Sequence, residues 1–356
     1  PSSGRVLVAM SGGVDSSVAA LLLGERGFDV LGVTFQFAPD RDEDPLSALG
    51  CSSVASVERA KQVCHRLNIP QHVIVRVETF QEMVIDPFCR QYAAGRTPNP
   101  CVRCNTFVKW PSLLEVAFAH DCSYIATGHY ARIHKEGERY QILRGEDRGK
   151  DQSYALYSLP QQSLGRTLFP LGSMTKEHVR KMAEKASLPT SGIGESQDIC
   201  FIPEGDYRSF LGPRLSVRPG PILDSEGHEV GTHKGLPFYT VGQRKGLGVA
   251  AGFPLYVIEK DTEANILVVG PREALCKRTF CVGEINWVST NPPPADASLQ
   301  AEVEVRYRTT PIPGELHVRD DGTVLIHVPQ HNQAIAPGQS AVWYQGDVLL
   351  GGGVIQ

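Results

Sequence analysis

The sequence predicts an α/β protein: a doubly wound parallel sheet of Rossmann-like type in an N-terminal domain, then a small central domain and a C-terminal antiparallel β-barrel. Two observations indicate this order. Apolar strands alternate with helices of about 10–15 residues early in the chain. Short strands of period two, separated by Gly, Pro and Asp turns, dominate its last part. We therefore expect three domains, at 1–207, 208–271 and 272–356.

The N-terminal elements follow from apolar periodicity and from helix start and stop signals. Gly27 ends the first expected helix, and a loop rich in Asp and Pro, 38–50, precedes the second. Expected strands are Arg5–Met10, Val30–Phe35, His72–Val77 and Tyr124–Thr127, and expected helices are Asp15–Arg26, Val54–Leu67, Leu113–His120 and Lys176–Ala186.

The chain changes character after residue 206, where Gly becomes frequent and apolar runs shorten. A Pro-rich stretch at 291–294 predicts a turn within the last domain. Alternating apolar and polar residues, or short apolar runs, predict strands at Pro254–Glu259, Asn265–Val269, 301–308, 323–328 and 340–344.

Composition limits the classes of function. Lys and Arg total 35 against 39 Asp and Glu, for a net charge of −4, so an RNA partner would need a local basic surface. The nine cysteines are odd in number and scattered, unlike a secreted disulfide framework. No apolar run reaches the ~20 residues that span a bilayer, and no signal-peptide pattern is visible. We expect a cytoplasmic protein without membrane contact.

Basic residues do gather locally. One group surrounds the cysteines at 101 and 104, a second runs through 129–150, and two more lie at 243–245 and 306–308. Lys and Arg would suit contact with phosphate, and interspersed Tyr would suit stacking on bases. Solvated loop faces would explain the same charges, so charge alone leaves RNA binding open.

The strongest local signal is the segment SGGVDSS at 11–17, between an expected strand and an expected helix. Its glycines allow the backbone to approach a ligand closely, and the helix start offers N–H groups and a positive dipole to phosphate. Asp15 would repel phosphate unless Mg²⁺ bridges the two. No Gly-Lys-Ser/Thr follows, so this is not a Walker A loop. The other interpretation is a Gly-Ser turn that only caps a helix.

A second signal lies in the cysteines. Cys101 and Cys104 belong to TPNPCVRCN, 97–105, whose prolines and asparagines predict a loop, not a helix, with exposed cysteines that can face a shared ligand. Cys200 lies in SQDICFIP, 196–203. Cys51 stays undecided, and small buried side chains are expected for Cys64, Cys89, Cys122, Cys276 and Cys281.

These motifs carry two resemblances. The segment 11–17 resembles the pyrophosphate-binding loop (PP-loop) of the ATP pyrophosphatase superfamily, and the whole chain resembles the tRNA 2-thiouridylase (MnmA) family. The resemblance implies ATP-dependent 2-thiolation of the wobble uridine of tRNA: adenylation of the uracil C2 oxygen with pyrophosphate release, then sulfur transfer. The matching segments are SGGVDSS (11–17), TPNPCVRCN (97–105), ATGHYAR (126–132), KDQSY (150–154), SQDICFIP (196–203), GQRKGLG (242–248), RYR (306–308) and PGQSAVWY (337–344).

The family resemblance implies ATP and Mg²⁺ as cofactors and assigns roles to individual residues. Cys104 would be the nucleophile, Cys200 the persulfide carrier, and Asp15 a catalytic residue at the nucleotide. The sulfur donor would be a cysteine desulfurase, a sulfur-relay protein or free sulfide. Nucleotide contacts are implied for Ala9, Met10, Ser11, Gly12, Gly13, Val14, Asp15, Ser16, Ser17, Phe35 and Gly128. Contacts with tRNA are implied for Asn99, Pro100, Cys101, His129, Lys150, Asp151, Gln152, Arg306, Tyr307 and Gln339.

Two departures from the family pattern leave details open. Cys101 stands where many members carry Asp, so Cys101, Cys104 and Cys200 could hold a [4Fe–4S] cluster that binds sulfide at its open iron. The persulfide route needs only the last two of these thiols. Ser56 and Arg59 stand where acidic residues are frequent, which leaves the contacts of that helix open.

Two other functions stay open. A PP-loop ligase that adenylates a small molecule would not need the cysteines, and a redox or metal-binding module would not release pyrophosphate. The thiolase hypothesis depends on one spatial expectation: segment 11–17 and the thiols of Cys104 and Cys200 should border a common cavity.

Overall fold

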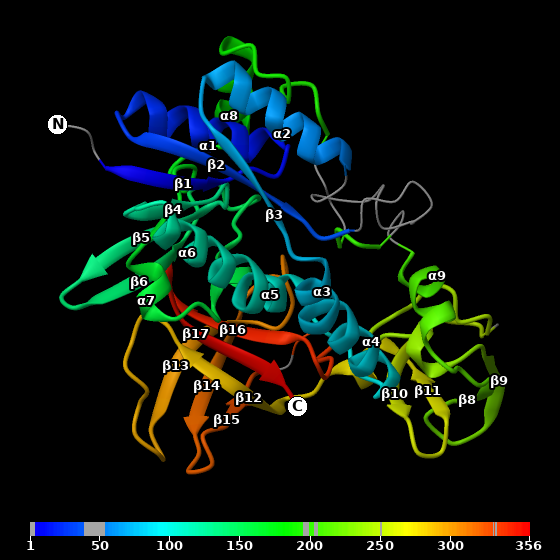
Figure 1. Cartoon of the computed structure of the whole chain (residues 1–356). Helices are drawn as coiled ribbons and strands as arrows, with labels where there is room; N and C mark the ends of the chain where they lie inside the picture. The colour runs from blue at the N-terminus through cyan, green and yellow to red at the C-terminus, as the bar shows by residue number, and fades with distance from the viewer. Residues whose placement is uncertain are drawn as a thin grey trace.

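The computed structural model describes residues 4–38, 54–194, 199–202, 206–249, 251–329, 331 and 333–356. Most of the expected loop 38–50, Cys51, and positions 196–198 and 203 of the Cys200 motif lie outside the described residues. Figure 1 shows an α/β part, a small sheet with short helices beside it, and a barrel next to the C-terminus. The predicted fold class is confirmed.

A five-stranded parallel sheet, in the order β3-β2-β1-β4-β7, forms the centre of the N-terminal part. Neighbouring residues of β1 pack on opposite faces, Leu7 with the cluster that includes α6 and Val8 with the cluster that includes α1 and α2. The strands are β1 (Arg5–Ala9), β2 (Asp29–Gln36), β3 (Gln71–Val75), β4 (Tyr124–Ala126) and β7 (Thr167–Leu168). The longer helices are α1 (Val14–Glu25), α2 (Val54–Leu67), α6 (Trp110–Ala119) and α8 (Lys176–Lys185).

The cysteine segment is helical, which corrects the predicted loop. Asn99 is the N-cap of α5 (Pro100–Cys104), and its side-chain oxygen accepts the backbone N–H groups of Cys101 at 3.1 Å and Val102 at 3.4 Å. Pro100 occupies the first helical position, where its missing N–H costs nothing. Proline and asparagine therefore start a helix here. The helix continues through Asn105–Lys109 into α6.

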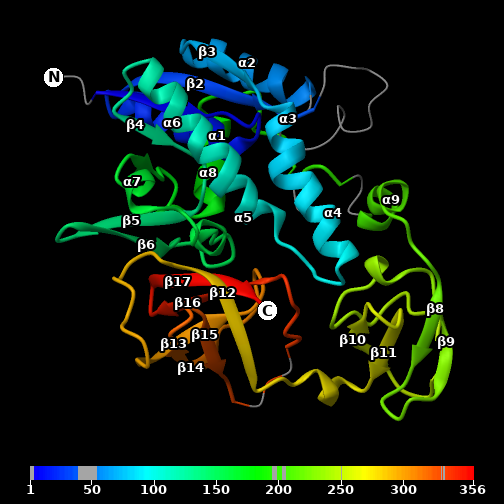
Figure 2. The ribbon, with the colours of Figure 1, turned by 60° about the horizontal axis from the view of Figure 1, so that its bottom comes forward.

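A central sheet, in the order β10-β11-β8-β9, lies beside α4 (Asp86–Ala93) in both Figure 1 and Figure 2. Its core is a separate apolar cluster that includes Ile222 and Val257. Its strands are β8 (Gly220–Leu223), β9 (Glu229–His233), β10 (Tyr256–Asp261) and β11 (Ile266–Gly270). The remaining short helices of the chain are α3 (Val77–Phe80), α7 (Gln161–Leu164) and α9 (Tyr207–Leu211).

The C-terminal strands close into a six-stranded antiparallel barrel, because β12 pairs with both β15 and β17. The predicted strand at 301–308 ends at Glu304, since the backbone turns where the N–H of Thr309 donates to the carbonyl of Arg306 at 3.1 Å. The barrel strands are β12 (Thr279–Trp287), β13 (Ser298–Glu304), β14 (Ile312–Val318), β15 (Val324–His327), β16 (Ser340–Gln345) and β17 (Val348–Ile355).

A hairpin that the sequence did not predict joins the barrel to the N-terminal part. Its strands are β5 (Ala131–Glu136) and β6 (Arg139–Arg144), and β6 pairs antiparallel with β17 through Leu143 and Val348. The barrel sheet therefore extends into the chain segment that follows β4. None of the described helices is long and apolar enough to cross a membrane.

Candidate nucleotide site and cysteine segment

A cavity of about 310 Å³ opens at the carboxyl ends of β1, β2 and β4. This is the switch point of the sheet. The next two strands in the chain, β2 and β3, lie on one side of β1, and the chain then crosses to β4 on the other side. Ligands bind at such points in parallel sheets. Every predicted nucleotide-binding residue except Ser17 lines the cavity: Ala9, Met10, Ser11, Gly12, Gly13, Val14, Asp15, Ser16, Phe35 and Gly128.

Two glycines give the cavity its shape. Gly12 has φ +71°, and a Cβ there would lie 2.3 Å from the carbonyl oxygen of Ser56. A Cβ on Gly128 would lie 2.8 Å from backbone atoms of Asp15 and Ser16. The end of β4 can approach the start of α1 this closely only because residue 128 has no side chain.

The hydroxyl groups of the turn have different roles. Ser16 donates its O–H to the carbonyl of Gly13 at 3.1 Å and accepts the N–H of Ser11 at 3.1 Å, which fixes the turn at the cavity wall. Ser17 is fully buried, donates to the same carbonyl at 2.9 Å and accepts the Thr190 hydroxyl at 3.0 Å. Ser17 supports the helix start from behind the cavity.

Asp15 is held by protein groups. Lys176 Nζ lies 2.6 and 2.7 Å from its two carboxylate oxygens, and the Tyr130 hydroxyl donates to it at 2.8 Å. The carboxylate is an oxygen ligand of the kind that Mg²⁺ prefers. The sequence did not identify Lys176 as a residue of the site, although it starts a predicted helix. The available signal was its place at the first helical position, where the positive end of the helix dipole disfavours a cation.

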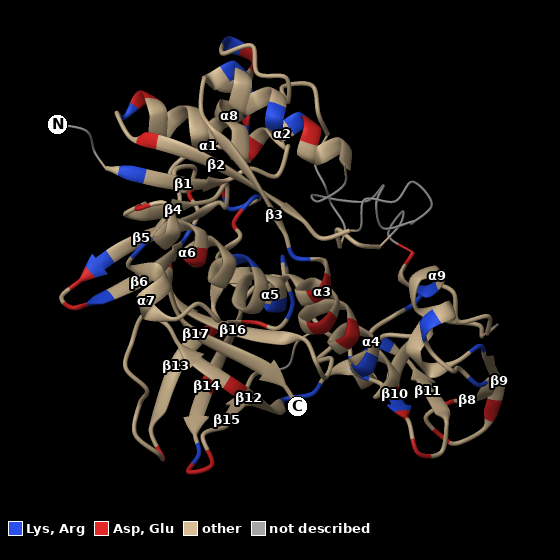
Figure 3. Cartoon of the chain, viewed as in Figure 1, with Lys and Arg blue, Asp and Glu red and all other residues tan. Residues whose placement is uncertain are grey.

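Cations surround the rest of the cavity. Arg59 lies in its wall and donates its Nε–H to the carbonyl of Gly12 at 3.2 Å. Helix α2, whose contacts the sequence left undecided, therefore contacts the glycine–serine turn. In Figure 3, several Lys and Arg positions gather around α5, between the parallel sheet and the barrel. Asp15 is the only carboxylate among the described residues of the lining, and the cations are Arg59, Lys109, Lys150, Lys176 and Arg308.

His129 lines the same cavity as a neutral ring. Its Nδ1 lies 2.7 Å from the Thr127 hydroxyl, and its ring packs near Trp110 and Phe169. Burial, together with the charge of Lys109, lowers the pKa of His129 to about 3. The ring can therefore exchange hydrogen bonds with a ligand but adds no positive charge at physiological pH.

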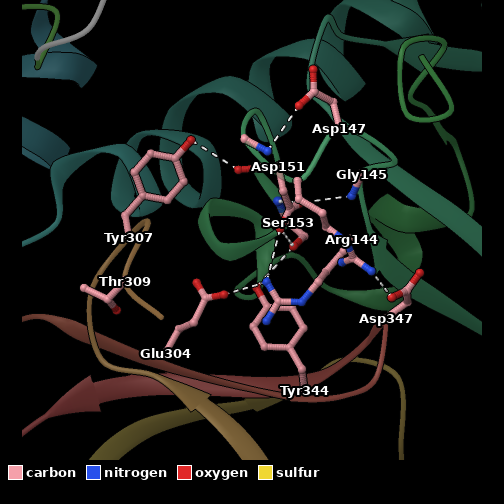
Figure 4. Close-up of polar contacts among 12 residues, drawn as sticks. Arg144, Gly145, Asp147, Asp151, Ser153, Glu304, Tyr307, Thr309, Tyr344 and Asp347 are labelled. Carbon is pink, nitrogen blue, oxygen red and sulfur yellow. Dashed lines mark hydrogen bonds and ion pairs between the residues drawn. The ribbon is translucent and has the colours of Figure 1, made fainter. Parts of the chain in front are cut away.

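The side chains of residues 150–152 point in two different directions. Lys150 and Gln152 line the nucleotide cavity. The Asp151 carboxylate faces away and accepts the N–H of Gly145 at 2.8 Å and the hydroxyl of Ser153 at 2.9 Å. Its side chain is only 8% exposed. Figure 4 shows these contacts, in which the carboxylate binds protein groups.

The thiols do not line this cavity. Cys104 is buried in α5, Cys101 is exposed, and Cys200 is half-buried. Cys104 and Cys200 pack against the same large apolar cluster, and Lys109, which follows Cys104 on the same continuous helix, reaches the cavity wall. The expected common cavity is therefore not seen, because segment 11–16 lines the nucleotide cavity whereas Cys104 and Cys200 lie at the adjoining apolar core. Among the remaining described cysteines, Cys64 and Cys122 are buried, whereas Cys89, Cys276 and Cys281 are half-buried.

Described residues offer no assembled metal centre. No group of three or more His, Cys, Asp or Glu side chains among them is arranged to hold a metal ion. Cys101, Cys104 and Cys200 are all described and do not form such a group.

The barrel contacts the cysteine segment directly. Gln339 donates its side-chain N–H to the carbonyl of Thr97 at 2.9 Å, and the N–H of Thr97 donates to the carbonyl of Pro337 at 2.8 Å. Tyr307 donates its hydroxyl to the carbonyl of Asp151 at 3.2 Å, whereas Arg306 is exposed. The residues expected from the C-terminal domain thus lie at the seam between the domains.

Comparison with known proteins covers the whole chain. Family models match 4–204, described as "tRNA methyl transferase HUP domain", 208–271, "tRNA methyl transferase PRC-barrel domain", and 277–355, "Aminomethyltransferase beta-barrel domain". A tRNA-specific 2-thiouridylase MnmA of Heliobacterium modesticaldum is 47% identical over 98% of this chain and 92% of that protein. The protein of the same name from Pelotomaculum thermopropionicum is 44% identical over 99% of this chain and 97% of that protein.

A solved structure, a 4-thiouridine synthetase–RNA complex with bound ATP, is similar at 16% identity. The match covers 60% of this chain and 51% of that chain, with a TM-score of 0.36. The methyl-transferase wording belongs to the family-model descriptions, whereas the relatives that match nearly the full length carry the thiouridylase name.

Proposed function

Because this chain belongs to the tRNA-specific 2-thiouridylase family, we propose that it places sulfur on C2 of the wobble uridine of tRNA with consumption of ATP. One observation carries the proposal. The glycine–serine turn, a cationic wall and the helix that bears Cys104 meet around one cavity at the switch point of the sheet. The parts 1–207, 208–271 and 272–356 would act as catalytic, central and tRNA-contacting domains.

The first step is activation of the base. Oxygen at C2 of uracil leaves poorly, and attack of that oxygen on the α phosphate of ATP converts it into an adenylate and releases pyrophosphate. Backbone N–H groups at the start of α1 and the lysines of the wall would stabilise the phosphate charge. Asp15 would hold Mg²⁺, which neutralises further phosphate charge when bound.

The second step is sulfur transfer. The outer sulfur of a Cys200 persulfide attacks C2, and AMP leaves with the bonding electrons of the C2–O bond. Cys104 thiolate then attacks the inner sulfur of Cys200, which releases the 2-thiouridine and leaves a disulfide between Cys104 and Cys200. A dithiol reductant regenerates both thiols, and the persulfide of a cysteine desulfurase or sulfur-relay protein then transfers its outer sulfur to the Cys200 thiolate. Free sulfide would instead attack the Cys104–Cys200 disulfide at the Cys200 sulfur, which forms the Cys200 persulfide and releases the Cys104 thiolate.

The target uridine would be taken out of the anticodon stack, at lower cost than in a duplex. Cys101 is exposed on the same helix as the buried Cys104. Contacts with tRNA from Asn99, Pro100, Cys101, His129, Lys150, Gln152, Arg306, Tyr307 and Gln339 remain part of this proposal. For Asp151 we propose an indirect role, because its carboxylate positions the neighbouring residues.

The test is thiolation of a tRNA that carries a wobble uridine, with ATP, Mg²⁺ and a cysteine desulfurase. Mass spectrometry of nucleosides measures 2-thiouridine, and a coupled assay measures single-turnover pyrophosphate release. Cys104→Ser and Cys200→Ser should each reduce thiolation by at least about 10³-fold, while pyrophosphate release with tRNA persists. Cys101→Ser should keep activity on the persulfide route.

Three other results would support a different function or mechanism. Full turnover by Cys200→Ser would remove the sulfur-carrier role and favour a ligase for a small molecule. Loss of activity in Cys101→Ser, with iron and sulfide in the anaerobically purified wild type, would replace the persulfide by a cluster. Absence of any tRNA-dependent pyrophosphate release would end the proposal.

A further inference from the structure

Arg308 lies on the wall of two cavities at once. It belongs to the connection between β13 and β14, in the barrel, yet it lines the nucleotide cavity together with the residues of the glycine–serine turn. It also lines a second cavity of about 590 Å³ at the seam between segment 144–154 and the barrel. The β13–β14 connection therefore brings a cation from one domain to the ligand site of the other.

The connection is attached to the N-terminal part at two points. Glu304, the last residue of β13, accepts the guanidinium of Arg144 at 2.5 Å, and both side chains are no more than 10% exposed. The Arg144 guanidinium also stacks 3.5 Å from the ring centre of Tyr344. Tyr307 then donates its hydroxyl to the carbonyl of Asp151 at 3.2 Å. Figure 4 shows Glu304 and Tyr307 reaching segment 144–153 from the barrel side.

The backbone at Arg308 is held in an uncommon conformation. Its φ is +62°, in the left-handed region that residues with a side chain rarely adopt. The guanidinium lies 5.1 Å from the ring centre of Tyr307, whose own ring packs against Tyr154 of the N-terminal part. Non-glycine residues in this region are concentrated where the surrounding structure imposes them, often at ligand sites.

The positive charges that line the nucleotide cavity suit a polyanionic ligand. Among its described lining residues, Asp15 is paired with Lys176, and the neutral His129 adds no charge. Arg59 is directed to the carbonyl of Gly12. Arg308 differs from the other cations because it alone comes from the barrel, and its planar guanidinium suits phosphate oxygens.

We propose that Arg308 binds a phosphate of the nucleotide, so that the C-terminal barrel supplies part of the nucleotide site. The inference rests on the proposed nucleotide site but not on the sulfur chemistry. The contacts between segment 144–154 and the barrel would then serve to position Arg308 at the nucleotide. Arg306 and Tyr307, the proposed tRNA contacts, directly precede Arg308, so RNA bound there acts on the same short connection that holds the phosphate. Nucleotide and tRNA should then raise each other's affinity by the same factor.

The experiment measures ATP and AMP binding to the full chain by titration calorimetry, without tRNA. Arg308→Gln should weaken ATP binding by about 10-fold or more, as expected for loss of a charge-assisted hydrogen bond. Arg308→Lys should recover part of the loss. The matched control is Arg319→Gln, because Arg319 is an exposed barrel arginine after β14 that lines neither cavity. Thermal unfolding of each variant verifies that the fold is kept.

The two ligands locate the contact. Weaker binding of ATP with unchanged binding of AMP places Arg308 on the β or γ phosphate, and equal weakening of both places it on the α phosphate. Wild-type affinity in Arg308→Gln overturns the inference, as does an equal loss in Arg319→Gln, which would reflect net charge alone. A wild type that binds ATP but does not thiolate tRNA would defeat the proposed function and leave this inference standing.

Discussion

The nucleotide cavity and the cysteine segment differ in how they are built. Most of the cavity is formed by residues that follow adjacent strands of the parallel sheet, and among its described lining residues only Arg308 comes from the barrel. The cysteine segment is a capped helix whose start is held by the barrel, through Gln339 and Pro337 on Thr97. One region depends on local backbone geometry, and the other depends on contacts between residues far apart in the chain.

This difference has a consequence for chemistry. The glycine–serine turn is already formed in the fold, because Gly12, Ser16 and Gly128 fix its shape. Cys104 and Cys200 lie at the apolar core next to it and do not line it. In the proposed reaction, activation precedes sulfur transfer, so burial of Cys104 protects a nucleophile until an activated base is present. Arg144 joins the segment that carries Lys150 and Gln152 into the cavity to Glu304 of the barrel, and the barrel in turn holds the start of the cysteine segment.

Arg144→Met should have the largest effect because it disturbs both regions. The substitution leaves the buried carboxylates of Glu304 and Asp151 without their cation, which typically costs about 3–5 kcal/mol of unfolding free energy. ATP affinity and Cys104 reactivity should both change. Chemical denaturation at pH 8 measures the loss. Arg148→Met is the control, since its pair with Asp347 is exposed and is worth less than about 1 kcal/mol.

The loss should depend on pH in a defined direction. Burial raises the pKa of the Glu304 carboxyl, and its bond and charge contact with Arg144 lower it. Without Arg144 the folded-state pKa rises further above the unfolded value, so the folded variant binds a proton more readily. Its stability deficit should therefore shrink as the pH falls from 8 toward 5 and grow as the pH rises through the raised pKa. A deficit independent of pH would mean that the cost comes from packing.

The sequence predicted the first region well and the second only in part. Strand, glycine turn and helix are consecutive in the chain, so the residues after β1 follow from local pattern, whereas Gly128 after β4 was implied by the family resemblance. Lys176, Arg59 and Arg308 come from distant segments, and no local pattern brings them to the cavity. The helix at Cys101 and Cys104 was missed because Asn and Pro were interpreted as loop signals, although both are favoured at a helix start.

Gly128→Ala should disturb the nucleotide region alone. Its new Cβ would lie 2.8 Å from backbone atoms at the start of α1, so the turn must shift, which typically costs about 1–3 kcal/mol. We expect ATP binding to weaken by about 10-fold in calorimetry, with unchanged alkylation of Cys104. Gly24→Ala is the matched control, because a Cβ there meets nothing within 4 Å and alanine favours the helix by about 0.5–1 kcal/mol. Equal loss of ATP binding in both variants would contradict a local effect.

Asn99→Ala is the complementary change in the cysteine region and should have the smallest effect. It removes the side-chain acceptor for the first N–H groups of α5, at a cost of about 1 kcal/mol. Cys104 is only 5% exposed, so its alkylation requires local opening and should become several-fold faster. Cys101, already exposed on the same helix, is the internal control and should react at its original rate. Asn99→Asp keeps the acceptor and should restore slow alkylation.

ATP affinity should stay within about 2-fold of the wild type in Asn99→Ala, since the cap contributes no atom to the nucleotide cavity. Together with Gly128→Ala, this pair separates the regions in both directions, because each substitution changes one readout and spares the other. A capping variant that weakened ATP binding as much as Gly128→Ala would show that helix α5 and the glycine–serine turn form one cooperative unit. Sulfur transfer and nucleotide activation would then respond to a single conformational equilibrium.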